Sequence, residues 1–243
     1  MDAAGMEPLL DYPFMVSVVP ALLRALPVTL NVTVVSMSLA LPLALATALV
    51  RISRVPVLRH VAALYVSFMR GTPLLVQIYL AYYGLPKVLN HLGDRYGWSL
   101  DVSSIPAIAF IYLAFTLNVG AYASETFRAA IEAIDRGQME AALSVGMTRW
   151  QGMRRIVLPQ ALTIALPSLG NTVIALLKDT SLAFLVSVVE LMGEAKIQAA
   201  RGLQFFEVYL VAALVYWVIC IGIERGMAVL ERRVRRYEGL SPA

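Results

Sequence analysis

Residues able to do chemistry are few in this chain, and their spacing excludes the common catalytic sites. The two histidines, His60 and His91, lie far apart and give no metal-ligand spacing. Cys220 is the single cysteine, so an internal disulfide is impossible. Ser144 lies in "ALSVG", where alanine stands in place of the first glycine of a nucleophile elbow. The sequence therefore predicts no catalytic residue and no metal site.

Five polar side chains interrupt apolar stretches, and they are the candidates for contact with a polar solute. They are Arg70, Asn118, Asn171, Lys178 and Asp179. A charge or an amide in apolar surroundings costs free energy unless it finds a partner, so each of them is a candidate site. Each also has a structural alternative. Arg70 could form a packing ion pair, the two asparagines could join helices by hydrogen bonds, and Lys178 could extend its ammonium to a membrane surface.

The composition indicates the elements that must position these residues. Of the 243 residues 59% are apolar and only 15% are charged, and the mean hydropathy is +0.73. Soluble domains have roughly 25% charged residues, so this chain is expected to be an all-α integral membrane protein. The net charge of +4 follows membrane topology and does not point to a nucleic-acid partner.

Five stretches are long and apolar enough to cross a bilayer, which takes about 20 residues. The predicted transmembrane helices are 25–50, 60–85, 102–124, 156–177 and 207–223. Glu125 is expected to mark the cytoplasmic end of the third. The stretch 180–189 is apolar but too short to cross, so a re-entrant or packed segment is expected there.

The basic residues predict the orientation, because Lys and Arg favour the cytoplasmic side. With the C-terminus inside, the cytoplasmic segments hold thirteen: three after the first span, five after the third and five after the last; the opposite side holds six. We therefore expect an extracytoplasmic N-terminal segment at 1–24, a transmembrane domain at 25–227 and a basic cytoplasmic tail at 228–243 on anionic lipid. The opening residues lack a basic n-region, which favours a retained span over a cleaved signal peptide.

A polar insert, "EAALSVGMTRWQGMRRIVLPQA" (140–161), separates the third and fourth spans. The sequence predicts a helix over 138–145 that ends at Gly146, because a helix C-terminus often needs a left-handed residue. Thr148 stands three residues before Gln151, as in a capping box, so a second helix is expected to begin there. Pro159 is expected to end that helix near Val157.

Two interpretations of the insert remain open from the residues alone. Trp150, Met153 and Val157 share one face of the second helix, so it could lie on lipid head groups with its arginines on phosphates. The first helix favours a protein partner. Its small residues Ala141 and Ala142, beside an exposed Glu140, make a thin helix suited to a groove.

The insert resembles the cytoplasmic coupling loop of ABC importer permeases. It matches the pattern E-A-A-x3-G-x9-I-x-L-P without a gap, at Glu140, Ala141, Ala142, Gly146, Ile156, Leu158 and Pro159. Three further segments resemble the polar amino acid permeases of the histidine and glutamine type: "RGTPLLVQ", "YASETFRAAIEAIDRGQMEAA" and "LKDTSL". The likeness extends over about 27–227. Within that subfamily, "YYGLP" and "LVYWVI" are most similar to cystine permeases.

This resemblance implies a multi-pass subunit of type I importer architecture in the inner membrane, with L-cystine as the favoured solute. It implies partners as well: a cytoplasmic ATPase dimer, a second permease copy or paralogue, an extracytoplasmic solute-binding protein and membrane lipid. No glycine is followed by lysine, so this chain has no phosphate-cradling loop, and ATP and Mg are expected on the ATPase. Lys178 and Asp179 would pair with the carboxylate and ammonium of an amino acid. The alternative is a stand-alone secondary transporter or channel, although no inverted repeat is visible.

Overall fold

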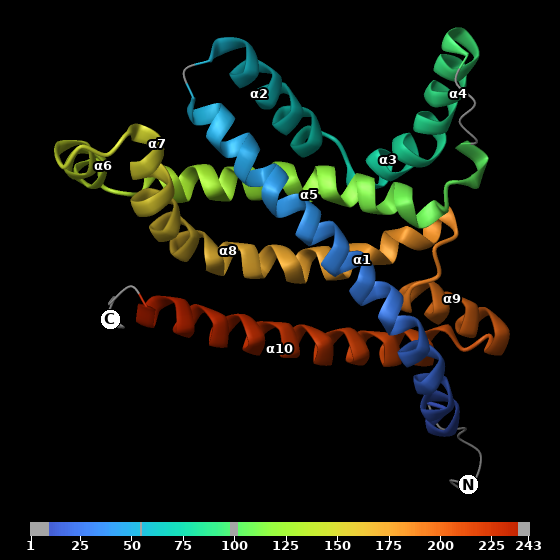
Figure 1. Ribbon diagram of the computed structural model, residues 1–243. Coiled ribbons are helices and arrows are strands. Elements are labelled where there is room, and N and C mark those ends of the chain that lie inside the picture. The colour runs from blue at the N-terminus through green and yellow to red at the C-terminus, as the bar shows by residue number, and fades with distance from the viewer. Residues whose placement is uncertain (1–9, 54, 98–101, 238–243) are drawn as a thin grey trace, which may run out of the picture.

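The computed structural model describes residues 10–53, 55–97 and 102–237, and within these ranges it holds helices and no strand (Figure 1). The elements in chain order are α1 (Tyr12–Ile52), α2 (Pro56–Gly71), α3 (Leu74–Tyr79), the π-helix η1 (Leu80–Gly84), α4 (Leu85–Tyr96), the 3-10 helix η2 (Val102–Ser104), α5 (Ala107–Glu132), α6 (Arg136–Ser144), α7 (Arg149–Gly152), the π-helix η3 (Met153–Val157), α8 (Leu158–Asp179), the 3-10 helix η4 (Thr180–Val186), α9 (Leu191–Gly202) and α10 (Phe205–Tyr237).

The predicted all-α membrane architecture is confirmed. Four helical segments of the described chain are long and apolar enough to span a bilayer: Tyr12–Ile52, Ala107–Glu132, Arg149–Val186 and Phe205–Val234. The fifth candidate is the bent pair Pro56–Gly71 and Leu74–Tyr96. The short stretch after α8 forms the 3-10 helix η4 rather than a crossing.

The second predicted span is not one continuous helix, which corrects the expectation for 60–85. Its two parts meet at 111°. Thr72 is extended, with φ −121° and ψ 146°, because the ring of Pro73 disfavours the helical conformation at the preceding residue. α2 therefore ends at Gly71, and the chain starts again in a new direction at Leu74.

The first and last long helices exceed their predicted lengths. α1 begins well before residue 25, because Asp11 caps it: the carboxylate accepts hydrogen bonds from Phe14 N at 3.0 Å and from Gln204 Nε2 at 3.1 Å. These donors lower the pKa of Asp11. α10 continues past residue 227 to Tyr237. The expected boundaries at 24 and 228 thus fall inside helices, while residues 1–9 and 238–243 lie outside the described chain.

The core forms where α1 crosses α5. Ala40, Ala44 and Ala48 of α1 are fully buried and recur every fourth residue, so they form one small-residue stripe on that helix. Phe115 of α5 is also fully buried in the same core. Small side chains let two helix backbones approach closely, and van der Waals contact rather than the hydrophobic effect holds such pairs inside a bilayer.

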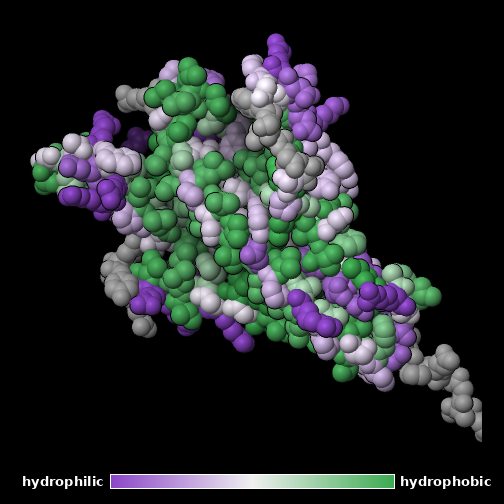
Figure 2. Space-filling view, turned by 45° about the vertical axis from the view of Figure 1, so that its right-hand side comes forward, coloured by the Kyte–Doolittle hydropathy of each residue, from purple (hydrophilic) through white to green (hydrophobic). Residues whose placement is uncertain are grey.

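The arrangement places polar segments at the ends of an apolar body. α6 and α7 lie at the same end of the molecule as the end of α10, and α1 begins at the opposite end (Figure 1). Hydrophobic residues cover much of the middle, while hydrophilic residues gather at the extremities (Figure 2). This banded distribution is the one expected for a chain whose middle faces lipid.

Candidate coupling corner and solute pockets

The polar insert folds as two helices around a glycine, as its sequence predicts. Asp135 caps α6 by accepting a 2.8 Å hydrogen bond from Gly137 N. Gly146 has φ +84°, the left-handed conformation that glycine adopts without strain. Thr148 and Gln151 form a complete capping box at the start of α7, with bonds of 2.8 and 3.2 Å. We call residues 136–152 the α6–α7 corner.

The second helix does not end near Val157, so that expectation is wrong. The chain widens into the π-helix η3, where Leu158 N donates to Met153 O five residues back, and then continues directly into α8. Pro159 lacks an N–H and can sit only where no helical donor is needed. The wide turn provides such a place at the first turn of α8, and the helix continues without a break.

The seven motif residues differ in exposure. Glu140, Ala141, Gly146 and Pro159 are exposed, whereas Ile156 and Leu158 are half-buried. Ala142 is 1% exposed. A methyl group placed on Gly152 would lie 3.3 Å from the Ala142 Cβ, so these two small residues bring α6 and α7 together. Ala142 therefore faces the corner's own interior, where its small side chain lets α6 and α7 pack closely.

Apolar side chains project from the corner. Val145 is 74% exposed, Trp150 is 62% exposed and Leu143 is 37% exposed. Of the three residues expected on one amphipathic face, Trp150 is exposed and Val157 is buried. Arg149, like the later Arg154 and Arg155, is also exposed. The corner therefore presents a mixed apolar and cationic surface that the described residues do not cover.

Three of the five candidate solute residues meet in one cavity, which we call the first pocket. It measures about 470 Å³. Asn118 comes from α5, and Asn171 and Asp179 come from α8. Thr72 and Pro73, at the break between α2 and α3, also line it, and Tyr122 and Thr172 add further polar groups. The fold thus brings together residues that are far apart in sequence.

A buried amide, which the sequence analysis missed, fixes the break beside this pocket. Gln77 Nε2 donates to Met69 O at 2.8 Å and to Thr72 O at 3.0 Å, so it satisfies carbonyls that the end of α2 leaves open. Its Oε1 accepts from Asn118 Nδ2 at 2.9 Å. The signal in the sequence is one amide inside the apolar run "LLVQIYL".

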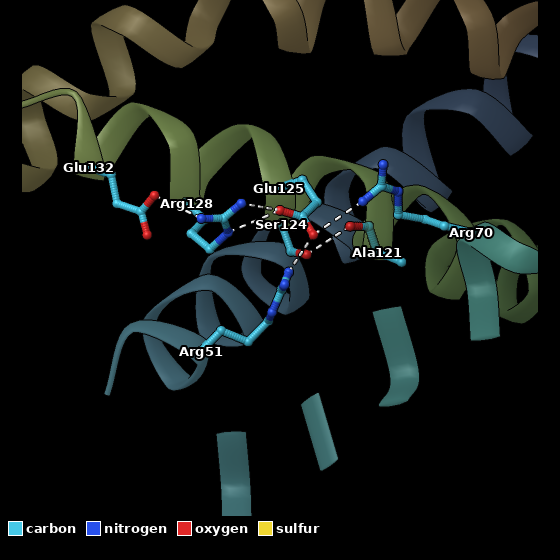
Figure 3. A network of polar contacts seen from close by, with 7 residues as sticks. All are labelled: Arg51, Arg70, Ala121, Ser124, Glu125, Arg128 and Glu132. Carbon is cyan, nitrogen blue, oxygen red and sulfur yellow. Dashed lines mark hydrogen bonds and ion pairs between the residues drawn. The ribbon is translucent and has the colours of Figure 1, made fainter. Parts of the chain in front are cut away.

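Arg70 lies in a neighbouring cavity of about 460 Å³, which we call the second pocket. It belongs to an ion-pair cluster around Glu125 (Figure 3). Glu125 Oε1 is 2.6 Å from Arg51 Nη1 and 3.2 Å from Arg70 Nη1, and Oε2 is 2.8 Å from Arg128 Nη2. Arg70 therefore forms the packing ion pair that the sequence analysis gave as its structural alternative. Glu125 does not end its helix, because α5 continues to Glu132.

Lys178 is not brought to either pocket. It is exposed, and it lines neither cavity although its neighbour Asp179 lines the first. Adjacent helical residues point about 100° apart, since an α-helix has 3.6 residues per turn. In this structure Asp179 therefore lines the first cavity without Lys178, and a shared solute site for the two side chains stays a prediction.

A buried carboxylate, also missed from the sequence, holds the far end of the fold together. Glu190 is fully buried and accepts hydrogen bonds from Met192 N at 3.0 Å, Gly193 N at 2.7 Å and the Tyr216 hydroxyl at 3.0 Å. The adjacent Leu191 N donates to Thr29 Oγ1 at 3.0 Å. The start of α9 is thereby tied to α1 and α10. The only sequence signal is an acid between Val189 and Leu191.

Comparison with known proteins decides the family. A family model described as a binding-protein-dependent transport system inner membrane component matches residues 15–236. The chain belongs to this family. It is 44% identical over 212 residues to the probable amino-acid permease protein YxeN of Bacillus subtilis, covering 87% of this chain and 90% of the relative. It is 42% identical over 210 residues to the L-cystine transport system permease protein TcyB of the same organism, covering 86% and 84%.

A solved structure agrees. The crystal structure of an amino acid ABC transporter with histidines superposes with a TM-score of 0.78 at 33% identity, covering 93% of this chain and 100% of that one. The protein is thus a multi-pass inner-membrane permease of the amino-acid ABC importers with the type I architecture. A permease of this family is not itself catalytic, and the ATPase is a separate subunit. Membership also implies pairing with a second permease and disfavours a stand-alone secondary transporter or channel.

Proposed function

We propose that this permease forms half of the solute path of a polar amino acid importer and receives mechanical work through the α6–α7 corner. An ATPase dimer, with ATP and Mg bound on its own subunits, would hold one corner from each of two permeases, identical or paralogous. Seven motif residues would make the contact with the ATPase or hold the contacting residues in place: Glu140, Ala141, Ala142, Gly146, Ile156, Leu158 and Pro159.

One observation supports this role above all. Val145 and Trp150 are both more than half exposed on the corner, at an end of the molecule where polar residues gather (Figure 2). Exposed apolar side chains rimmed by charge are typical of a protein contact. A lipid surface is the alternative, because the exposed Arg149 would attract anionic head groups, whereas the exposed Glu140 would be repelled by them. The match of the motif residues to the coupling loop of ABC importer permeases favours the protein contact.

The solute path in this proposal passes through the first pocket. Asn118 and Asn171 offer hydrogen bonds, and the carboxylate of Asp179 would attract the ammonium of an amino acid. Arg70 would contact the solute from the adjoining pocket. Lys178 would contact it only if its side chain turned toward the first pocket. L-cystine is the favoured solute, supported by the 42% identity to TcyB. An extracytoplasmic binding protein would deliver it.

The proposed orientation follows from the basic residues. The end that holds the corner and the end of α10 would face the cytoplasm, and the start of α1 would face outward. In this topology residues 1–24 form the outer segment, 25–227 the permeation domain with its coupling loop at 125–160, and 228–243 the basic tail on anionic lipid.

The test is uptake into proteoliposomes that contain the permease, its ATPase and its binding protein. Glu140→Lys and Gly146→Asp are expected to lower ATP-driven uptake of L-cystine at least about tenfold while ATP hydrolysis continues, because either change alters the corner's contact surface. Gly97→Asp is the matched control, since Gly97 also has a left-handed φ (+71°) and open space around it, but lies at the end of α4. L-arginine and L-glutamine are tested as competing solutes. Uptake without the ATPase, driven by an ion gradient, would reject the coupling proposal.

A further inference from the structure

The two pockets adjoin along one face of α5. Asn118 lines the first, Glu125 lines the second, and Tyr122 lines both. These three residues are spaced i, i+4 and i+7, so they lie in a row on the same side of the helix. Seven residues of helix advance about 10 Å. The second pocket therefore lies about two turns closer to the α6–α7 corner than the first.

The second pocket carries more positive than negative charge. Arg51, Arg70 and Glu125 line it, and Arg128 and Glu132 join the same cluster through Glu125 and through each other. Three arginines face two glutamates, which leaves one positive charge without a counter-charge in the cluster. A cavity of about 460 Å³ at such a place can accept a small anionic group.

Arg70 is the member of the cluster that can leave most easily. Its side chain is 47% exposed and its contact to Glu125 is the longest of the three, whereas Arg51 is 19% exposed and 2.6 Å away. Glu125 would keep Arg51 and Arg128 if Arg70 turned away, so this half-buried carboxylate would not be left unpaired. The Arg70 guanidinium also lies over the Tyr122 ring at 5.7 Å, at the boundary of the two pockets.

We propose that the second pocket is a separate binding station for the carboxylate of the transported solute, with Arg70 as its anchor. The solute carboxylate replaces Glu125 as the partner of the Arg70 guanidinium, whose parallel N–H groups match a carboxylate. The ammonium is held first, by Asp179 in the first pocket, and the carboxylate is held second, nearer the corner. This inference rests on the proposed function, because it assigns the chemistry of one step on the same path.

The test is equilibrium binding to the permease–ATPase complex in lipid nanodiscs without the binding protein. The probe is the radiolabelled form of whichever of L-cystine, L-arginine and L-glutamine the wild-type transporter takes up, together with its carboxamide analogue. Arg70→Gln is expected to weaken binding of the acid about tenfold to a hundredfold and to leave binding of the carboxamide unchanged. Arg70→Lys keeps the positive charge but loses the paired N–H groups of the guanidinium. Its affinity for the acid is expected to lie between those of the wild type and of Arg70→Gln.

Arg128→Gln is the matched control. It also removes one arginine from Glu125, but Arg128 does not line the second pocket. It is expected to keep the wild-type preference for acid over carboxamide. An Arg70→Gln protein that binds the acid as tightly as the wild type, or that loses acid and carboxamide equally, would overturn the proposal; if that variant does not assemble, Arg70→Lys decides by the same comparison. Failure of the proposed function is distinguishable, because then the wild type itself would neither take up nor bind any of the three solutes.

Discussion

Asn118 donates a 2.9 Å hydrogen bond to Gln77, and this bond joins the middle of α5 to the break between α2 and α3. Gln77 in turn holds the end of α2 through Met69 O and Thr72 O. The wall of the first pocket and the bend of the second span are thus fixed by the same buried amide. A change at Gln77 should therefore affect both stability and solute passage.

We predict that Gln77→Leu lowers the free energy of unfolding by about 2 kcal/mol, because it leaves the amide of Asn118 and two carbonyls without their partner. Thermal unfolding in detergent measures this. Gln198→Leu is the control, since Gln198 makes one half-buried bond to Glu194 within its own helix, and it should cost less than about 0.5 kcal/mol. Equal losses in the two variants would contradict the role given to Gln77.

Glu190 should be among the most sensitive positions for stability. Glu190→Ala removes the acceptor of Met192 N, Gly193 N and the Tyr216 hydroxyl, and is expected to cost about 3 kcal/mol. Tyr216→Phe removes only one of these bonds and should cost about 1 kcal/mol. Chemical unfolding followed by tryptophan fluorescence separates the two. A Glu190→Ala protein as stable as Tyr216→Phe would show that the carboxylate does not hold α9.

The α1–α5 contact predicts a face-dependent response to added volume. Ala44→Leu forces a larger side chain into a fully buried position and should cost about 1 to 3 kcal/mol. Ala46→Leu, on the exposed side of the same helix, should change stability by less than about 0.5 kcal/mol. Folded yield and melting temperature in one detergent compare them. A similar cost for both would mean that α1 does not bury the Ala44 face.

The capping box gives a local prediction for the corner. Thr148→Ala removes the acceptor of Gln151 N and should destabilise the start of α7 by about 1 kcal/mol. Because the corner lies outside the core, amide hydrogen exchange in α7 should speed up several-fold while the melting temperature changes little. Thr148→Ser retains the hydroxyl and serves as the control. Unchanged exchange in the alanine variant would argue against the cap.

Local signals in the sequence predicted the corner well. Gly146, Thr148 and Gln151 act through residues three or fewer positions away, so their geometry follows from spacing alone. The error near Val157 has a different cause: whether a proline ends a helix depends on the turn before it, and the π-helix η3 that accommodates Pro159 has no distinct sequence pattern.

The ion-pair cluster could not be predicted from spacing. Arg51, Arg70 and Glu125 come from three helices, and only the crossing of α1, α2 and α5 brings them within 3.2 Å. A polar residue inside an apolar run, such as Gln77 or Glu190, indicates that it has a buried partner, but it does not indicate which residue that partner is. Apolar length predicts the number of spans, while their bends and contacts depend on the tertiary fold.

The central claim is that the α6–α7 corner contacts the ATPase, and cross-linking tests it most directly. A photo-reactive amino acid is placed at Val145, which is 74% exposed on the corner, or at Leu203, which is 79% exposed beyond α9 at the other end of the molecule. On illumination of membranes that contain the whole transporter, we predict an adduct with the ATPase from position 145 and none from position 203. An ATPase adduct from position 203, or its absence from position 145, would contradict the account.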